Sequence, residues 1–557
     1  MEHDPDLAEA IAAFRIGELE RSRQLAEQQL ELGPSPQLYH LIGLIDCREG
    51  KIESGIEWLR QALDAEPGNR GYRLMLVRAL IDVGRGSEAL EFSGRPSGSG
   101  PLELPLWHAR SEAADAAGDS NAAVEAYQVL CAADSRDWRV WTSLGRNLFK
   151  VERMADSERA YQRAMAIAPR EAAPVYELGL VYDRTNQHEQ LADLLDLASR
   201  LGIAKDQLAE LWAILEYRAG NIDEARKLIS ESDGHADVSR LERLRAKLAD
   251  AAGNYAEAFA AAARMNRTTP DFEQWRARAA KYRQELRDLA ELITPGWVSQ
   301  LPRLPVGADR VPAFLVGFPR SGTTLLDTFL MGHPQVEVIE EKGLLVTAGE
   351  ATGSLDTLPQ RSRDEALRAR GSYFDLLGRY AERNTGGLIV DKAPLNMLAV
   401  PLIHCLFGEP RIIFAQRHPC DAVLSGFMQS FVANLGMASF LDIVDAADFY
   451  VAAMRVWTAS SAALPLRIHT VVYEDLVREP EATLRPLVDF LGLRWDDRML
   501  DHQATAKDRG PIHNPSYDQV TQALNDRAVG RWRRYEAQLK PVLPVLMPWA
   551  ERLGYRD

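Results

Sequence analysis

The first half of the chain repeats itself with a period of 34 residues, over roughly positions 36 to 235. Gly43, Gly145 and Gly179 lie at multiples of this spacing, and Trp107 and Trp141 lie one period apart. Further pairs keep the spacing or three times it: Ala89 and Ala123, Tyr127 and Tyr161, Pro67 and Pro169. A period of this length indicates units that cannot bury their apolar faces alone and therefore stack on one another. We expect an array of about seven or eight helical units.

The residues that repeat have the sizes that stacked helices need. A small residue lets the next helix approach closely, a large aromatic fills the gap beside it, and a proline stands where the second helix stops. The pattern resembles tetratricopeptide repeats, which implies an α-helical superhelix with a concave groove for a peptide or another chain. The alternative is that the array only rigidifies the protein or joins two copies in a homodimer.

A proline-rich segment between Thr294 and Ala313 interrupts the helical pattern. Because proline lacks an amide donor and fixes its own dihedral angle, this segment cannot continue a helix. The chain of 557 residues is also too long for one core. We predict a repeat domain over 1–294, a linker over 295–312 and a second domain over 313–557.

The net charge of -15 argues against a general nucleic-acid partner, so an anionic ligand would need a local basic pocket. The acidic first residues and the lack of a long apolar run predict a cytoplasmic protein without a membrane span. The cysteines form no CxxC pair or Cys/His cluster, which indicates free thiols and no metal site. They are Cys47, Cys131, Cys405 and Cys420.

The second domain begins with a strand, a glycine-containing loop and a helix. Residues 313–317 form an apolar run typical of a buried strand, and residues 324–330 are typical of a helix. Backbone N–H groups and the helix dipole favour an anion in the intervening loop. Gly317 and Gly322 have the spacing of a Walker A loop, but Thr323 stands where an NTPase carries lysine. This substitution argues against a nucleotide-binding phosphotransferase.

The loop sequence from Gly317 to Thr324 resembles the 5'-phosphosulfate loop of sulfotransferases. The similarity continues through Gly332-His333-Pro334 and Glu340-Glu341, a run closest to tyrosylprotein sulfotransferases. The resemblance implies an α/β P-loop-type domain with a mainly parallel sheet, which binds 3'-phosphoadenosine-5'-phosphosulfate (PAPS) and releases the bisphosphate PAP. It implies donor contacts from Arg320, Ser321, Gly322, Thr323 and Thr324.

Three later segments extend the resemblance. After the strand at 411–415, Arg417 and Ser425 match the family's 3'-phosphate contacts, where a guanidinium can hold phosphate bidentately. Tyrosine-modifying members carry another arginine where this chain has Gln429, and a lysine where it has Arg531. The remaining implied donor contacts are Tyr473 after the strand at 468–472, and Ser516, Gln519, Asn525 and Arg531 near the C-terminus.

Sulfuryl transfer requires a base for the acceptor hydroxyl and cations where the leaving phosphate gains charge. The resemblance implies that Glu341 is the base, with Glu340 as its rival. It implies that Arg320 holds the phosphosulfate, that Lys392 assists, and that Ser516 hydrogen-bonds the transferring group. Since arginine and lysine supply the charge, no metal is expected.

Two nearby positions bear on the choice of base. Small-molecule sulfotransferases commonly carry a histidine base where this chain has Pro394, which favours the glutamate. His333-Pro334 is expected to be an ordering turn. The predicted acceptor is a protein or peptide hydroxyl, tyrosine first; a glycan, a lipid and a small metabolite stay open. A non-catalytic repeat scaffold is disfavoured because the implied site residues are intact.

Overall fold

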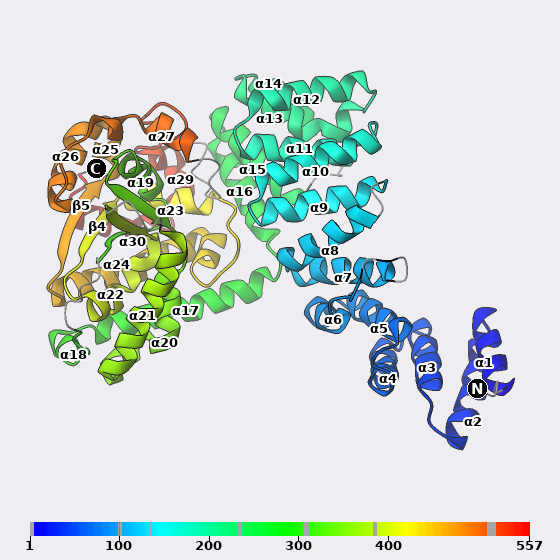
Figure 1. Ribbon diagram of the computed structural model, residues 1–557. Helices are drawn as coiled ribbons and strands as arrows, with labels where there is room; N and C mark the ends of the chain where they lie inside the picture. The colour runs from blue at the N-terminus through cyan, green and yellow to red at the C-terminus, as the bar shows by residue number, and fades with distance from the viewer. Residues whose placement is uncertain are drawn as a thin grey trace. The chain divides into compact units, whose positions relative to one another are not determined.

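The computed structural model describes residues 5–98, 100, 103–133, 136–230, 237–304, 311–381, 387–509 and 520–556 (Figure 1). The chain divides into two compact units, Met1–Leu211 and Trp212–Asp557. Among the described helices, none has the length and apolar character needed to cross a bilayer.

The first unit consists of helices joined by short turns. Most have 13 or 14 residues, and successive helices such as α3 and α4, or α9 and α10, pack as pairs. The helices up to the unit boundary are α1 (Pro5–Arg15), α2 (Leu19–Leu32), α3 (Pro36–Arg48), α4 (Ile52–Ala65), α5 (Arg70–Asp82), α6 (Gly86–Ser93), α7 (Leu104–Ala117), α8 (Ser120–Ala133), α9 (Trp138–Lys150), α10 (Met154–Ile167), α11 (Ala172–Arg184), α12 (His188–Arg200), the 3-10 helix η1 (Lys205–Leu208) and α13 (Ala209–Arg218), whose last residues belong to the second unit.

The glycines that set the 34-residue period lie where paired helices meet. A Cβ atom on Gly145 would stand 2.7 Å from Cε1 of Tyr161, and one on Gly43 would stand 2.9 Å from Cγ of Leu59. Close-packed interiors do not accommodate such approaches, so these positions require the smallest residue. The predicted helical repeat fold is confirmed, including a small residue against a large aromatic.

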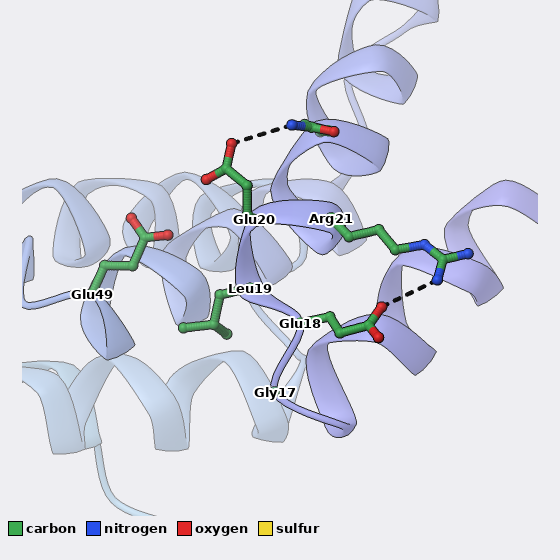
Figure 2. A pocket seen from close by; sticks show the side chains of 7 residues that line it. Gly17, Glu18, Leu19, Glu20, Arg21 and Glu49 are labelled. Carbon is green, nitrogen blue, oxygen red and sulfur yellow. Dashed lines mark hydrogen bonds and ion pairs between the residues drawn. The ribbon is translucent and has the colours of Figure 1, made fainter.

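A shallow pocket lies on the first unit beside the turn between α1 and α2 (Figure 2). Its charged groups pair with their neighbours: Arg21 Nη1 donates to Glu18 Oε2 over 3.1 Å, and Gln24 Nε2 donates to Glu20 Oε1 over 3.2 Å. It contains none of the residues predicted to bind the donor. The lining residues are Gly17, Glu18, Leu19, Glu20, Arg21, Gln24 and Glu49.

The second unit is built on a five-stranded sheet with the order β2-β3-β1-β4-β5, in which every neighbouring pair is parallel. This confirms the predicted α/β class. The strands are β1 (Ala313–Gly317), β2 (Val336–Glu340), β3 (Leu388–Lys392), β4 (Arg411–Gln416) and β5 (Arg467–Val472). The three strands read from the sequence at 313–317, 411–415 and 468–472 are thus present, and α19 (Thr323–Met331) follows the loop as expected.

Helices cover both faces of the sheet. Phe314 and Val316 of β1 belong to one apolar core, and Ala313 and Leu315 belong to a second on the opposite face. This alternation is the period of two that a strand imposes, and it explains why β1 is buried along its whole length. The main helices are α22 (Val400–Phe407), α23 (Pro419–Phe427), α24 (Ile443–Ala463) and α30 (Leu543–Arg552) on the first core, and α19, α25 (Tyr473–Arg478), α26 (Pro480–Leu491) and α27 (His502–Asp508) on the second.

The remaining elements of this unit complete its frame. They are α14 (Ile222–Ser230), α15 (Val238–Ala251), α16 (Tyr255–Arg267), α17 (Phe272–Leu292), α18 (Pro295–Ser299), α20 (Leu344–Thr352), η2 (Leu355–Gln360), α21 (Arg363–Tyr380), η3 (Pro394–Leu398), η4 (Met437–Leu441), η5 (Asp497–Leu500), η6 (Arg531–Tyr535) and α29 (Glu536–Leu539). Helix α17 ends at Leu292, just before the proline-rich segment, and the five-residue α18 begins inside it. Proline cannot continue a helix but is well suited to begin one, and here Pro295 follows the N-cap Thr294.

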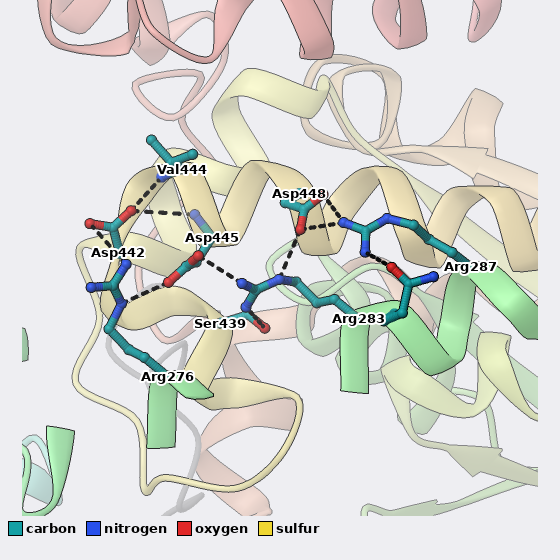
Figure 3. A network of polar contacts seen from close by, with 9 residues as sticks. Arg276, Arg283, Arg287, Ser439, Asp442, Val444, Asp445 and Asp448 are labelled. Atoms are coloured by element: carbon teal, nitrogen blue, oxygen red, sulfur yellow. Dashed lines mark hydrogen bonds and ion pairs between the residues drawn. The ribbon is translucent and has the colours of Figure 1, made fainter. Parts of the chain in front are cut away.

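Helix α17 is fastened to α24 by a row of ion pairs (Figure 3). Arg283, only 5% exposed, contacts Asp445 over 2.7 Å and Asp448 over 3.0 Å. Arg276 contacts Asp445 over 2.8 Å, and Arg287 bonds to Asp448. Residues from α15, α16 and α17 also join the apolar core of the sheet. The compact unit thus starts before residue 294. The border predicted at residue 294 stays a prediction, namely that the chain after it folds on its own.

Candidate active site

The predicted site residues gather at the carboxyl end of the sheet. Because β1 lies between β3 and β4, the loop after β1 is flanked by Lys392 at the end of β3 and by Arg417 just after β4. Glu340 ends β2 and pairs in register with Lys392. Ligands of open parallel sheets bind at this edge, where the strand order changes direction.

Two glycines shape the loop. Gly322 has φ +88°, and a Cβ atom there would lie 2.4 Å from Cδ2 of Tyr473. A Cβ atom on Gly317 would lie 2.5 Å from the carbonyl oxygen of Ala415. Both positions therefore require glycine, and the ring of Tyr473, the first residue of α25, packs against the loop. The loop side chains of Ser321, Thr323 and Thr324 are buried.

Three arginines converge beside this loop. Arg320 Nε donates to Ser425 Oγ over 3.1 Å, and Arg417 Nη1 donates to the carbonyl oxygen of Arg320 over 2.8 Å. Burial, followed by the charges of Arg417 and Arg531, lowers the pKa of Arg320 to about 10. Burial and neighbouring cations destabilise a charged guanidinium, so an anion that binds beside it stabilises it. The arrangement is suited to hold phosphate or sulfate.

One nitrogen of Arg417 has no partner within the ranges that the structure describes and could meet such an anion. Its Nη1 and Nη2 donate to main-chain carbonyls, the latter to Ala528 over 2.7 Å, and its guanidinium stacks 4.5 Å from the centroid of the Tyr473 ring. Its Nε is buried without a hydrogen-bond partner among the described residues. Since buried donors are almost always satisfied, this atom fits a phosphate contact. Arg320, Arg417 and Ser425, predicted from separate segments, are thus brought together.

Lys392 is the centre of a buried ionic cluster. Its side chain is 0% exposed, and Nζ lies 2.7 Å from Glu341 Oε1, 2.9 Å from Glu340 Oε1 and 3.5 Å from Asp327 Oδ2. Burial lowers the pKa of Lys392, but the charges of the three carboxylates outweigh it and raise the pKa above its ordinary value. Arg509 completes the cluster by pairing with Asp327 over 2.8 Å and with Glu340.

The two adjacent glutamates differ in their surroundings. The Glu340 side chain is 19% exposed and bridges Lys392 and Arg509, whereas that of Glu341 is 50% exposed and contacts Lys392. Glu341 has φ +49°, and Arg320 has φ +70°. Such conformations are costly for residues with a side chain and cluster at functional sites. Of the two carboxylates, Glu341 is the more accessible to solvent.

Asp327 and Arg509 are absent from the sequence prediction. Asp327 had a detectable signal, since it is a lone carboxylate within the apolar run of α19. A buried acid of this kind requires a cation, and burial raises its pKa despite Lys392 and Arg509. Arg509 lies 182 residues away from Asp327, and no local pattern identifies it.

The structure places the other predicted residues as follows. Ser516 and Gln519 lie outside the described residues. Asn525 is exposed, and its Nδ2 donates to the carbonyl oxygen of Ala523 over 3.2 Å. His333 has its Nε2 2.8 Å from the carbonyl oxygen of Arg494 and its Nδ1 accepting from the amide of Gln335, in keeping with an ordering turn. The described residues contain no group of three or more His, Cys, Asp or Glu side chains that could hold a metal ion.

Asp391, beside Lys392, makes stability depend on pH. The Tyr373 hydroxyl donates to Asp391 Oδ2 over 2.9 Å, and burial raises the pKa of Asp391 to about 7. Between about pH 4 and 7, Asp391 of the folded protein therefore holds a proton that the unfolded chain has lost. The contribution of Asp391 to the free energy of unfolding thus falls as pH rises through this window. We expect a loss of roughly 2 kcal/mol between about pH 5.5 and 8.

Urea unfolding of the wild type and of Asp391→Asn, whose amide does not titrate, measures this effect. The variant should lose the part of the pH dependence that Asp391 supplies, while its unfolding remains cooperative. An unchanged pH dependence in Asp391→Asn would show that other groups are responsible.

Comparison with known proteins agrees with this geometry. Residues 312–497 match the family model described as "Sulfotransferase family". An uncharacterized protein of Aquifex aeolicus is 28% identical over 289 residues, which are 49% of this chain and 37% of that protein. The chain thus spans little more than a third of that relative. Protein-tyrosine sulfotransferase 1 of Danio rerio is 25% identical over 260 residues, covering 43% of this chain and 71% of the relative.

Two solved structures have partial similarity to the chain. A tetratricopeptide repeat protein from Parabacteroides merdae has 15% identity and a TM-score of 0.35, covering 42% of this chain and 94% of its own. The sulfotransferase domain of the Synechococcus PCC 7002 olefin synthase has 22% identity and a TM-score of 0.29, covering 42% of this chain and 91% of its own. The loop after β1, the convergence of Arg320 and Arg417 and the family match together identify the region 312–497 as similar to sulfotransferases.

Proposed function

We propose that the protein is a sulfotransferase that moves the sulfuryl group of PAPS to an acceptor hydroxyl. The observation that carries this proposal lies at one edge of the sheet, where Arg417 contacts the main chain of Arg320 in the loop after β1. At the same edge, the accessible carboxylate of Glu341 pairs with the buried Lys392. An anion site alone would serve many proteins. A base beside it indicates transfer to a hydroxyl.

The proposed reaction forms a bond between the acceptor oxygen and sulfur as the bond from sulfur to the bridging phosphate oxygen breaks. Glu341 takes the acceptor's proton, and the electron pair of the broken bond leaves on the phosphate of PAP. Arg320 stabilises the charge that develops on this leaving phosphate. Lys392 holds Glu341 through the 2.7 Å ion pair and adds a second positive charge beneath the site.

The residues present fit the two ends of the donor. The loop amides and Arg320 would hold the 5'-phosphosulfate. Arg417 and Ser425 would hold the 3'-phosphate through the Ser425 hydroxyl and the Arg417 Nε, which has no hydrogen-bond partner in the described part of the chain. Guanidinium and hydroxyl donors are the groups that phosphate recognition commonly uses. Tyr473, Ser516, Gln519 and Asn525 stay proposed donor contacts on the strength of the resemblance.

The acceptor we propose is a hydroxyl of a protein or peptide, tyrosine first. The relatives named as protein-tyrosine sulfotransferases support this choice, as does the accessible glutamate. The helical repeats would offer a groove for an extended peptide. A glycan, a lipid or a small metabolite is the alternative acceptor, and a cytoplasmic location and a homodimer stay predictions.

Replacing Glu341 by glutamine should separate catalysis from donor binding. We expect turnover to fall by roughly 10²–10⁴-fold, as for loss of a general base, whereas the affinity for PAP should stay within about threefold. Transfer from radiolabelled donor to proteins of a cell extract gives the turnover, and calorimetric titration with PAP gives the affinity. Full activity in Glu341→Gln would make Glu341 the wrong base.

A matched variant tests Glu340, the other candidate for the base. Glu340→Gln alters the neighbouring carboxylate, which Arg509 and Lys392 hold inside the cluster. It should lower stability more than Glu341→Gln does, and turnover less. Absence of both PAP binding and sulfuryl transfer in the wild type would contradict the proposed function itself.

A further inference from the structure

Arg531 is held by α15, a helix that precedes the sheet in the chain. Arg531 Nη2 lies 3.1 Å from Asp250 Oδ1 on α15, and the Tyr535 hydroxyl donates to the same carboxylate oxygen. Burial lowers the pKa of Arg531, but Asp250 and Tyr535 outweigh it and raise the pKa. Asp250 thus fixes both ends of the short helix η6.

Arg531 also belongs to the electrostatic surroundings of the phosphate loop. Its charge contributes to the lowered pKa of Arg320. Its Nη2 contacts Met428 Sδ over 3.4 Å, at the end of the helix that carries Ser425. A guanidinium in this place adds positive potential where the donor phosphates are proposed to bind.

The main chain around Arg531 is anchored independently of its side chain. The amides of Gly530 and Trp532 donate to Asp421 over 2.7 and 2.8 Å, and Ala528 accepts from Arg417. These bonds fix where the Arg531 side chain begins, but they leave its long stem free to choose a rotamer. The ion pair with Asp250 holds the side chain at its charged end.

We propose that Asp250 is a positioning residue of the donor site, which holds the Arg531 guanidinium ready for the donor phosphates. The inference rests on the proposed use of PAPS. It gives α15 a part in donor affinity, although no residue of α15 belongs to the phosphate loop. Ordering a flexible arginine before the ligand arrives lowers the entropic cost of binding.

The test is the affinity for PAP of the full-length protein, measured by calorimetric titration. Asp250→Asn should weaken PAP binding roughly tenfold and raise the KM for the donor, while kcat changes less than about twofold. Asp250→Glu, which keeps the charge, should bind within about threefold of the wild type. Tyr535→Phe removes the other hydrogen bond to Asp250 and should bind as the wild type does.

A double-mutant cycle separates positioning from general stability. In an Arg531→Gln background, Asp250→Asn should have no further effect on PAP affinity. An equal loss in that background would overturn the inference, as would unchanged or tighter binding by Asp250→Asn alone. If the wild type does not bind PAP, the proposed function fails; if it binds and the cycle shows no coupling, only the role of Asp250 fails.

Discussion

A fragment that begins at residue 295 should fail to fold, whereas one that begins at residue 237 should unfold cooperatively. The shorter fragment lacks α17, so Asp445 and Asp448 lose the arginines that pair with them. Removing one partner of a buried ion pair costs about 3–5 kcal/mol, and Leu286 and Leu289 leave the core as well. These losses approach the total stability of a typical domain, about 5–15 kcal/mol.

Circular dichroism and thermal melts of the two fragments measure the difference. In the full chain, Arg283→Met should lower the melting temperature, whereas Lys281→Met, an exposed lysine on the same helix, serves as a matched control and should not. A cooperative melt of the 295–557 fragment would establish the predicted border at 294. Deletion to residue 236, rather than 294, is therefore the sound way to ask whether the repeats present the acceptor.

Replacing Lys392 by methionine should abolish activity and strongly destabilise the second unit. Three carboxylates lie within 3.5 Å of its Nζ, and two of them, Asp327 and Glu340, would keep Arg509 as their cation. We expect the free energy of unfolding to fall by about 3–5 kcal/mol. Turnover should fall by at least about 10³-fold, because the cation that holds Glu341 is lost.

Urea unfolding and donor turnover measure the two effects. Lys342→Met is a matched control, because this exposed lysine lies over the Tyr380 ring rather than in the cluster. It should change the unfolding free energy by less than about 0.5 kcal/mol. A Lys392→Met protein as stable and active as the wild type would show that the buried charges do not need this cation.

The sequence predicts those structural features that depend on residues close together in the chain. The glycine spacing predicts the repeats, because these glycines recur at multiples of 34 residues where paired helices pack together. The apolar run at 313–317 predicts the strand before the loop. The ionic cluster has no local cause: Lys392 and Glu340 meet because β2 and β3 pair, and Arg509 arrives from far along the chain. The same limit applies to α17, which has a helical pattern but whose partners on α24 are more than 160 residues away.

The charges of the cluster around Lys392 do not balance. Asp327, Glu340 and Glu341 face two cations, Lys392 and Arg509, so the five groups are electrically neutral only when they share one proton. Of the three acids, Glu341 has the most exposed side chain, at 50% against 19% and 0%. Glu341 is therefore the acid of the cluster that solvent reaches most readily, and the cluster presents one uncompensated negative charge at the edge of the sheet.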